Sequence, residues 1–194
     1  MSSCLSGGAS TSIGIPADPV NVAIIGTREE LIRTMLAAKW YPADPLTLKS
    51  SVEIAADTVL RRPYEDAPVS SLYLFGRKED LAFEKPVGND PRHRNHVRFW
   101  KGPKPDADGR PVWLGAATYD RGVGLSHTTG EVTHHIASDV DTERDRLIGD
   151  IESTGRVSES TRETGFHKVR EGKNGGGDPW HTDGDLRIVV LKPD

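Results

Sequence analysis

Three strand-like runs followed by a helix start, all between Arg92 and Asp145, constrain the fold more than any other part of the sequence. The runs are RHRNHVRFWK, GRPVWLGAATYDRG and TGEVTHHI, and the helix start is SDVDTERDRLIGDI. Short apolar or alternating runs separated by polar, Pro- and Gly-rich segments indicate strands joined by turns. The stretch also holds five of the seven histidines, so we expect it to carry most of the polar chemistry.

The flanking segments predict further strands and helices. VNVAIIG has the length and apolar content of a strand, and Thr27 with Glu30 forms the T-x-x-E capping-box pattern. Apolar stripes at helical spacing predict helices near residues 28–40, 47–61 and 141–153. SSLYLFG, apolar on both faces, is expected to be a central strand, and LAFEKP is expected to form a hairpin with it.

The C-terminal part predicts three more strands. Arg156–Thr164 is polar with a loose alternation, which favours an edge strand. Phe166–Arg170 is expected to form another strand, and DLRIVVLKP a closing strand. KNGGGDPWHTDG between them is expected to be a long turn.

These elements predict a single α+β domain with a mixed, mainly antiparallel sheet and about three helices. A chain of 194 residues is long enough to bury a core. The Gly/Ser-rich residues 1–18 are expected to be a flexible tail, and residues 19–194 the folded domain. The single cysteine, Cys4, forms no intrachain disulfide, which fits a reducing compartment.

Charge and hydropathy exclude some classes of function. A net charge of −4 argues against bulk nucleic-acid binding. No run approaches the roughly 18 apolar residues that span a bilayer, and the first residues lack the pattern of a signal peptide. We therefore expect a cytoplasmic protein with no transmembrane segment.

The basic strand RHRNHVRFWK is the first candidate site. Alternation places Arg94, His96 and Arg98 on one face with Trp100, and Asn95, Val97 and Phe99 on the other. Two guanidiniums and an imidazole on one face suit a phosphate or carboxylate ligand. The alternative is a solvated sheet face whose charges pair with neighbouring Asp and Glu residues.

The histidine pair His134–His135 is the second candidate site. Adjacent strand residues face opposite ways, so we expect only one of the two on the side of the basic strand, and we favour His135. A metal alternative joins His96 and His134 with Asp139, holding a divalent ion such as zinc or manganese. The simpler interpretation is one buried, hydrogen-bonded histidine and one on the surface.

Two polar clusters have structural explanations. Asp139, Asp141, Glu143 and Asp145 crowd a helix start, where carboxylates cap free N–H groups and complement the helix dipole. The glycines of KNGGGDPWHTDG could form an anion-binding nest, but a hairpin turn is the favoured interpretation.

Several blocks in order resemble the LssY C-terminal domain family. They are PVNVAIIGTREEL, APVSSLYLFGRKEDLAFEKPVG, PRHRNHVRFWKG, GRPVWLGAATYDRGVGLS, THHIASDVDTERDRL and NGGGDPW, from about Pro19 to the C-terminus. In many members this domain follows a membrane-embedded part similar to a phosphatidic-acid phosphatase or a DedA-like protein. The resemblance implies association with a membrane protein, although this chain carries no such part, and it implies no particular catalytic residues.

Two function hypotheses remain open. The first is a noncatalytic accessory domain without a cofactor, which recognises a phosphorylated small molecule or lipid head group through Arg94, His96, Arg98 and His135. The second is a metal-dependent hydrolase, a phosphoesterase in particular, using the metal alternative above. The sequence does not decide whether the protein is an enzyme.

Overall fold

The computed structural model describes residues 9–10, 17–43, 72–88, 93–125, 127, 130 and 132–194. The helix expected near residues 47–61 falls outside this part of the chain. All statements below refer to the described residues.

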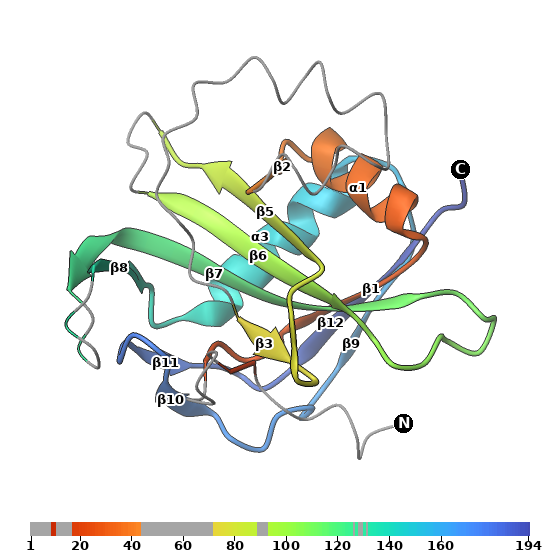
Figure 1. Cartoon of the computed structure of the whole chain (residues 1–194). Helices are drawn as coiled ribbons and strands as arrows, with labels where there is room; N and C mark the ends of the chain where they lie inside the picture. The colour runs from red at the N-terminus through yellow and green to blue at the C-terminus, as the bar shows by residue number, and fades with distance from the viewer. Residues whose placement is uncertain are drawn as a thin grey trace.

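One large sheet dominates the fold (Figure 1). It has eight strands, seven of them in the order β2-β5-β6-β7-β1-β12-β9, with β8 paired to β7. Their bounds are β1 Val22–Ile25, β2 Tyr41–Pro42, β5 Leu81–Pro86, β6 Arg94–Lys101, β7 Val112–Leu125, β8 Val132–Ile136, β9 Val157–Glu163 and β12 Leu186–Leu191. Among the strands of the described residues, β1 and β12 are the one parallel pair, so the prediction of a mixed, mainly antiparallel sheet is confirmed.

Two short hairpins lie off the large sheet. They are β3 (Tyr73–Leu74) with β4 (Arg77–Lys78), and β10 (Glu171–Lys173) with β11 (Pro179–His181). The expectation that SSLYLFG is a central strand is wrong. Phe75 and Gly76 both adopt positive φ, 57° and 73°, and they reverse the chain after a strand of two residues.

The C-terminal expectations are met in part, and the long turn expected at KNGGGDPWHTDG also contains Lys173 of β10 and all of β11. β9 forms the edge of the sheet, as predicted, and the predicted closing strand is β12, which pairs with β9. The strand expected at Phe166–Arg170 is wrong, because this segment has neither strand conformation nor a ladder partner. Instead, Phe166 packs into the core and the imidazole Nε2 of His167 contacts the carbonyl of Val20.

Two helices lie in the described part of the chain, α1 (Arg28–Ala37) and α3 (Val140–Ser153), rather than about three. Both begin as the sequence predicts. Thr27 Oγ1 accepts from the Glu30 amide at 3.1 Å, and Glu30 Oε2 accepts from the Thr27 amide at 2.8 Å, which completes a capping box. α1 ends slightly earlier than predicted, and Lys39 follows in a left-handed conformation with φ of 63°.

Both helices cover the same face of the sheet. Leu31, Ile32 and Met35 of α1 share a fully buried cluster with residues of α3 and with Phe99 of β6. The α3 residues in this cluster are Leu147, Ile148 and Ile151. Burying each such side chain contributes about 1.5–3 kcal/mol relative to leaving it exposed, so this layer fixes both helices on the sheet.

The opposite face of the sheet is also covered. A second cluster includes Trp100, Leu114 and Phe166 together with Ala9 and Ala17. Ala9 and Ala17, from the segment expected to be a flexible tail, are almost fully buried, and a backbone bridge joins Ser10 to Tyr73. The basic strand therefore faces a covered layer rather than open solvent.

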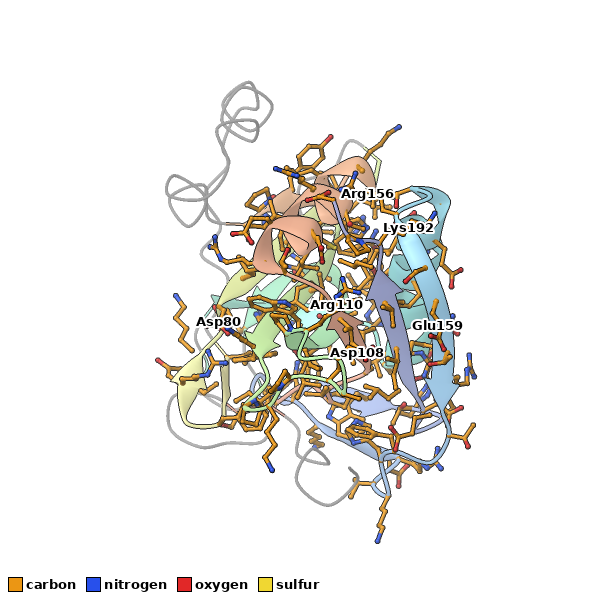
Figure 2. All side chains as sticks on the ribbon, turned by 90° about the vertical axis from the view of Figure 1, so that its right-hand side faces the viewer. Asp80, Asp108, Arg110, Arg156, Glu159 and Lys192 are labelled. Atoms are coloured by element: carbon orange, nitrogen blue, oxygen red, sulfur yellow. The ribbon has the colours of Figure 1, made fainter. Side chains whose placement is uncertain are left out.

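The β6–β7 hairpin is anchored to α1 and β12 by Arg110. Its guanidinium donates to Glu30 Oε2 at 2.8 Å and to the Leu191 carbonyl at 2.9 Å. In Figure 2, Arg110 lies near the middle of the view, Arg156 and Lys192 lie above it, and Glu159 lies on the edge strand β9. Glu30 Oε2 thus serves the capping box and this ion pair at once.

Candidate functional site

The predicted alternation along β6 is observed. Val97 and Phe99 enter the helix-side core, whereas Trp100 enters the opposite core. Direct cross-strand partners share a face of a sheet, and the partner of His96 is Glu84 while the partner of Arg94 is Asp120. The polar side chains of β6 therefore meet carboxylates from both neighbouring strands.

Each basic side chain of this face contacts a carboxylate. Arg94 Nη1 lies 2.9 Å from Glu84 Oε2, and His96 Nε2 lies 3.1 Å from Asp120 Oδ2. Arg98 Nη1 lies 3.8 Å from an oxygen of Asp18. The alternative interpretation, in which these charges pair with neighbouring Asp and Glu residues, therefore agrees with the observed contacts.

The face is not solvated, however. Arg94 and Arg98 are 8% exposed and His96 is 2% exposed. The second core and the segment around Asp18 cover them. Charges in such a layer are held by their partners, because leaving one unpaired there is strongly unfavourable.

Asp18 connects this layer to the β10–β11 turn. Burial raises the pKa of its carboxyl, Arg98 opposes that effect, and Asp120 and Asp178 add to it. The side chain of Asn174, in the turn between β10 and β11, also opposes the rise in the pKa of Asp18. Asp18 therefore lies between the basic strand and a second polar group around Asp178.

That second group consists of His127, His135 and Asp178, whose potential metal-binding atoms lie within 4.8 Å of one another. His135 Nδ1 lies 2.7 Å from Asp178 Oδ1, and His127 Nε2 lies 4.0 Å from the same oxygen. The two imidazole centroids are 5.2 Å apart. We call this set the His–His–Asp cluster.

Both oxygens of the Asp178 carboxylate have hydrogen-bond partners. Asp178 Oδ2 accepts from the Ile136 amide at 3.1 Å, which leaves Oδ1 for the two imidazoles. The Asp178 amide donates to Asn174 Oδ1, and the Asn174 amide donates to the Asp178 carbonyl. These bonds confirm the hairpin-turn interpretation of NGGGDPW.

The structure shows other contacts for one residue of the predicted metal set. Asp139 is the N-cap of α3, and its Oδ1 accepts from the amides of Asp141 and Thr142. The side chain of His134 is outside the described part, and its backbone pairs with Val123. The metal alternative with His96, His134 and Asp139, and the choice of histidine facing the basic strand, stay predictions.

Sequence reasoning singled out His135 but did not join it to His127 or Asp178. The only signal for Asp178 was its place in the glycine-rich turn. The contact with His135 spans 43 positions and depends on how the β10–β11 hairpin docks on β8. No spacing within the sequence encodes that docking.

A further charged cluster surrounds the fully buried Arg144 of α3. Its guanidinium donates to both oxygens of Asp145 and of Asp183, and also to Asp141. The hydrogen bond from Arg144 lowers the pKa of Asp183 to about 2. Every nitrogen of the guanidinium is engaged, so this cluster joins α3 to the segment before β12 and is structural.

The fold and these sites define a mixed α+β domain with charged side chains buried on the face of the sheet away from its helices. No helix among the described residues has both the length and the apolar character to cross a bilayer.

A family model, LssY C-terminus, matches residues 3–186. The match covers nearly the whole chain, and the chain belongs to this family. Comparison with curated proteins found no match, and comparison with solved structures found none either.

Proposed function

We propose that this domain is a noncatalytic binding module for an anionic, phosphate-bearing group, held by Arg94, His96 and Arg98 with His135 at the edge of the site. The observation that carries the proposal is the guanidinium of Arg94. Its Nη1 donates to Glu84, but its buried Nε finds no hydrogen-bond acceptor among the described residues.

Burial distinguishes Arg94 from three more exposed arginines with the same feature. Arg33, Arg156 and Arg187 also have an Nε without a described partner. Their side chains are 40%, 34% and 19% exposed, whereas that of Arg94 is 9% exposed. A buried donor without an acceptor costs about 1–3 kcal/mol, so an oxygen-rich ligand that reaches Arg94 recovers that free energy.

The ligand must compete with a carboxylate. Glu84 has a 24% exposed side chain and lies at the rim, whereas the Asp120 side chain is 8% exposed. We expect Glu84 to turn outward when a phosphate enters, because its carboxylate can be solvated there. A phosphate then makes the bidentate contact with Arg94 that its geometry favours.

Calorimetric titration in metal-free buffer tests this function, with inorganic phosphate and glycerol 3-phosphate as probes. Arg94→Gln should abolish the binding heat, and Glu84→Gln should tighten binding several-fold by removing the competing charge. Arg156→Gln, an arginine near the C-terminus, is the matched control and should bind as the wild type does. Absence of binding by the wild type, or unchanged binding by Arg94→Gln, rejects the proposal.

The same phosphate chemistry occurs on free molecules and on lipid head groups. Flotation with phosphatidylcholine vesicles, with and without phosphatidic acid, distinguishes the two sources. Binding to vesicles that depends on phosphatidic acid and on Arg94 identifies a lipid head group as the ligand. Binding of glycerol 3-phosphate alone identifies a free ligand of a cytoplasmic domain.

A second candidate function is a metal-dependent phosphoesterase, which the His–His–Asp cluster favours. Three protein ligands with an open position are the usual arrangement of a catalytic zinc. Hydrolysis of p-nitrophenyl phosphate in the presence of zinc or manganese tests it. Activity that requires the metal and is lost in His127→Ala supports the hydrolase, and a rate equal to that of buffer with metal eliminates it.

A further inference from the structure

We infer that His127, His135 and Asp178 bind one divalent transition-metal ion, with zinc as the best match. This inference goes beyond anion recognition by β6 and does not depend on it. Imidazole and carboxylate ligands suit zinc and ferrous iron, whereas magnesium and calcium prefer oxygen ligands alone.

The distances between the potential ligand atoms are close to those between the ligand atoms of a bound zinc ion. Tetrahedral zinc with bonds of about 2.0–2.1 Å to nitrogen and oxygen places its ligand atoms about 3.3 Å apart. Here the separations from Asp178 Oδ1 are 2.7 Å to His135 and 4.0 Å to His127. The distance to His135 is shorter than 3.3 Å and the distance to His127 is longer. Small side-chain rotations would lengthen the first and shorten the second.

The backbone already fixes the ligands relative to one another. Asp178 is tied to β8 through the Ile136 amide, next to His135. The His127 amide donates to the Gly176 carbonyl at 2.9 Å, in the same turn that carries Asp178. The turn that carries Asp178 is therefore bonded to the backbone of His127 and of the residue after His135, which lowers the entropy lost when an ion binds.

Gly124 leaves room for the His135 ring. A Cβ at this position would lie 2.5 Å from His135 Nε2 and 2.8 Å from its Cδ2. Gly124 has no side chain, and the imidazole occupies the space over its backbone. This close approach requires glycine for steric reasons and not for a left-handed φ.

The cluster also has an accessible side. The His127 side chain is 68% exposed, whereas that of Asp178 is 4% exposed. A bound ion would be held from the protein side by the carboxylate and would keep a position open to water or to a phosphate oxygen. A structural role for Asp178, joining the β10–β11 turn to β8, accounts for its bonds to His135 and Ile136 but does not involve the side chain of His127.

Metal titration of the whole 194-residue chain tests the inference. The protein is stripped with a chelator and titrated with cobalt(II), whose visible absorption reports coordination, and zinc is then added in competition. We expect one ion per chain, with displacement by zinc. His127→Ala removes a direct ligand and should weaken binding by more than the roughly 10- to 100-fold that loss of an outer-shell partner costs, with little change in Tm because the side chain is exposed.

His181→Ala is the matched control, since His181 is an exposed histidine on β11 outside the cluster. It should bind the metal as the wild type does. Gly124→Ala should reduce affinity by displacing His135. A wild-type protein that takes up no metal, or equal affinity in His127→Ala and the wild type, overturns the inference. Because no phosphate is present, failure here does not bear on anion binding.

Discussion

The side-chain amide of Asn21 pairs with the backbone of Ala117 as a neighbouring strand would. Its Nδ2 donates to the Ala117 carbonyl at 3.0 Å and its Oδ1 accepts from the Ala117 amide at 2.9 Å. β7 pairs with β1 before this point and with β8 beyond it. Asn21 therefore fills the gap between two strands that share one side of β7, and it also reaches the Val140 carbonyl at the start of α3.

Asn21→Ala should destabilise the protein by about 2–4 kcal/mol, because it leaves buried backbone groups of Ala117 without partners. Urea unfolding monitored by circular dichroism measures the change. Asn95→Ala removes a buried amide whose observed bond is to the exposed side chain of Arg146, and it should have a smaller effect. Equal losses of stability in the two variants would show that the pairing with Ala117 contributes no more than an ordinary buried amide.

Arg144→Met should destabilise the protein by about 1–3 kcal/mol, because it removes the hydrogen bonds that join α3 to Asp183. Arg146→Met, two positions further along α3, is the control. The Arg146 side chain is 46% exposed, so we expect a change below about 1 kcal/mol. Chemical unfolding of both variants at neutral pH decides whether the Arg144 cluster holds α3 in place.

Glu143 should make stability fall as pH rises. Burial raises the pKa of its carboxyl from 4.5 to about 8, and Arg146 only partly opposes this. The folded state therefore keeps a proton that the unfolded state has released, and stability declines from about pH 4.5 to 8. Glu143→Gln should remove this decline and be more stable at pH 9 by on the order of a few kcal/mol.

Unfolding curves at several pH values between 5 and 9 measure this effect, with Glu152→Gln as control. Glu152 lies on the same helix with a 42% exposed side chain and should keep the wild-type slope. A Glu143→Gln protein with the wild-type pH dependence would show that Glu143 is ionised in the fold.

Asp183 should make the stability of the fold decrease as pH falls in the acid range. Its pKa is lowered from 3.8 to about 2 by the hydrogen bond from Arg144. The folded state resists protonation, so this stabilisation is present above about pH 4 and is lost as pH falls toward 2. Asp183→Asn should make the fall of Tm at acid pH less steep. The change should be modest because the Asp183 side chain is 39% exposed. An unchanged slope would contradict this.

Local patterns in the sequence predicted much of the fold. The T-x-x-E pattern placed the capping box at Thr27 and Glu30, and strand alternation assigned Val97 and Trp100 to opposite faces. These features depend only on neighbours in the chain. The prediction of a central strand at SSLYLFG was wrong because the apolar run contains a turn at Phe75–Gly76, which composition alone does not reveal.

The candidate sites were less predictable for a physical reason. Alternation placed Arg94 and Arg98 on one face but could not show that Asp18 covers that face. His135 and Asp178 meet only because a hairpin docks on β8. Contacts of this kind depend on tertiary packing between distant segments, so neither spacing nor periodicity contains them.

The most direct test of the central claim is the proton signal of Arg94 Nε–H in NMR spectra recorded during phosphate addition. The guanidinium Nε–H of Arg94 lacks an acceptor among the described residues, and a bound phosphate would supply one. We predict that this signal shifts downfield and saturates with phosphate, while that of Arg156 stays in place. An Arg94 signal that does not move at saturating phosphate would contradict the account.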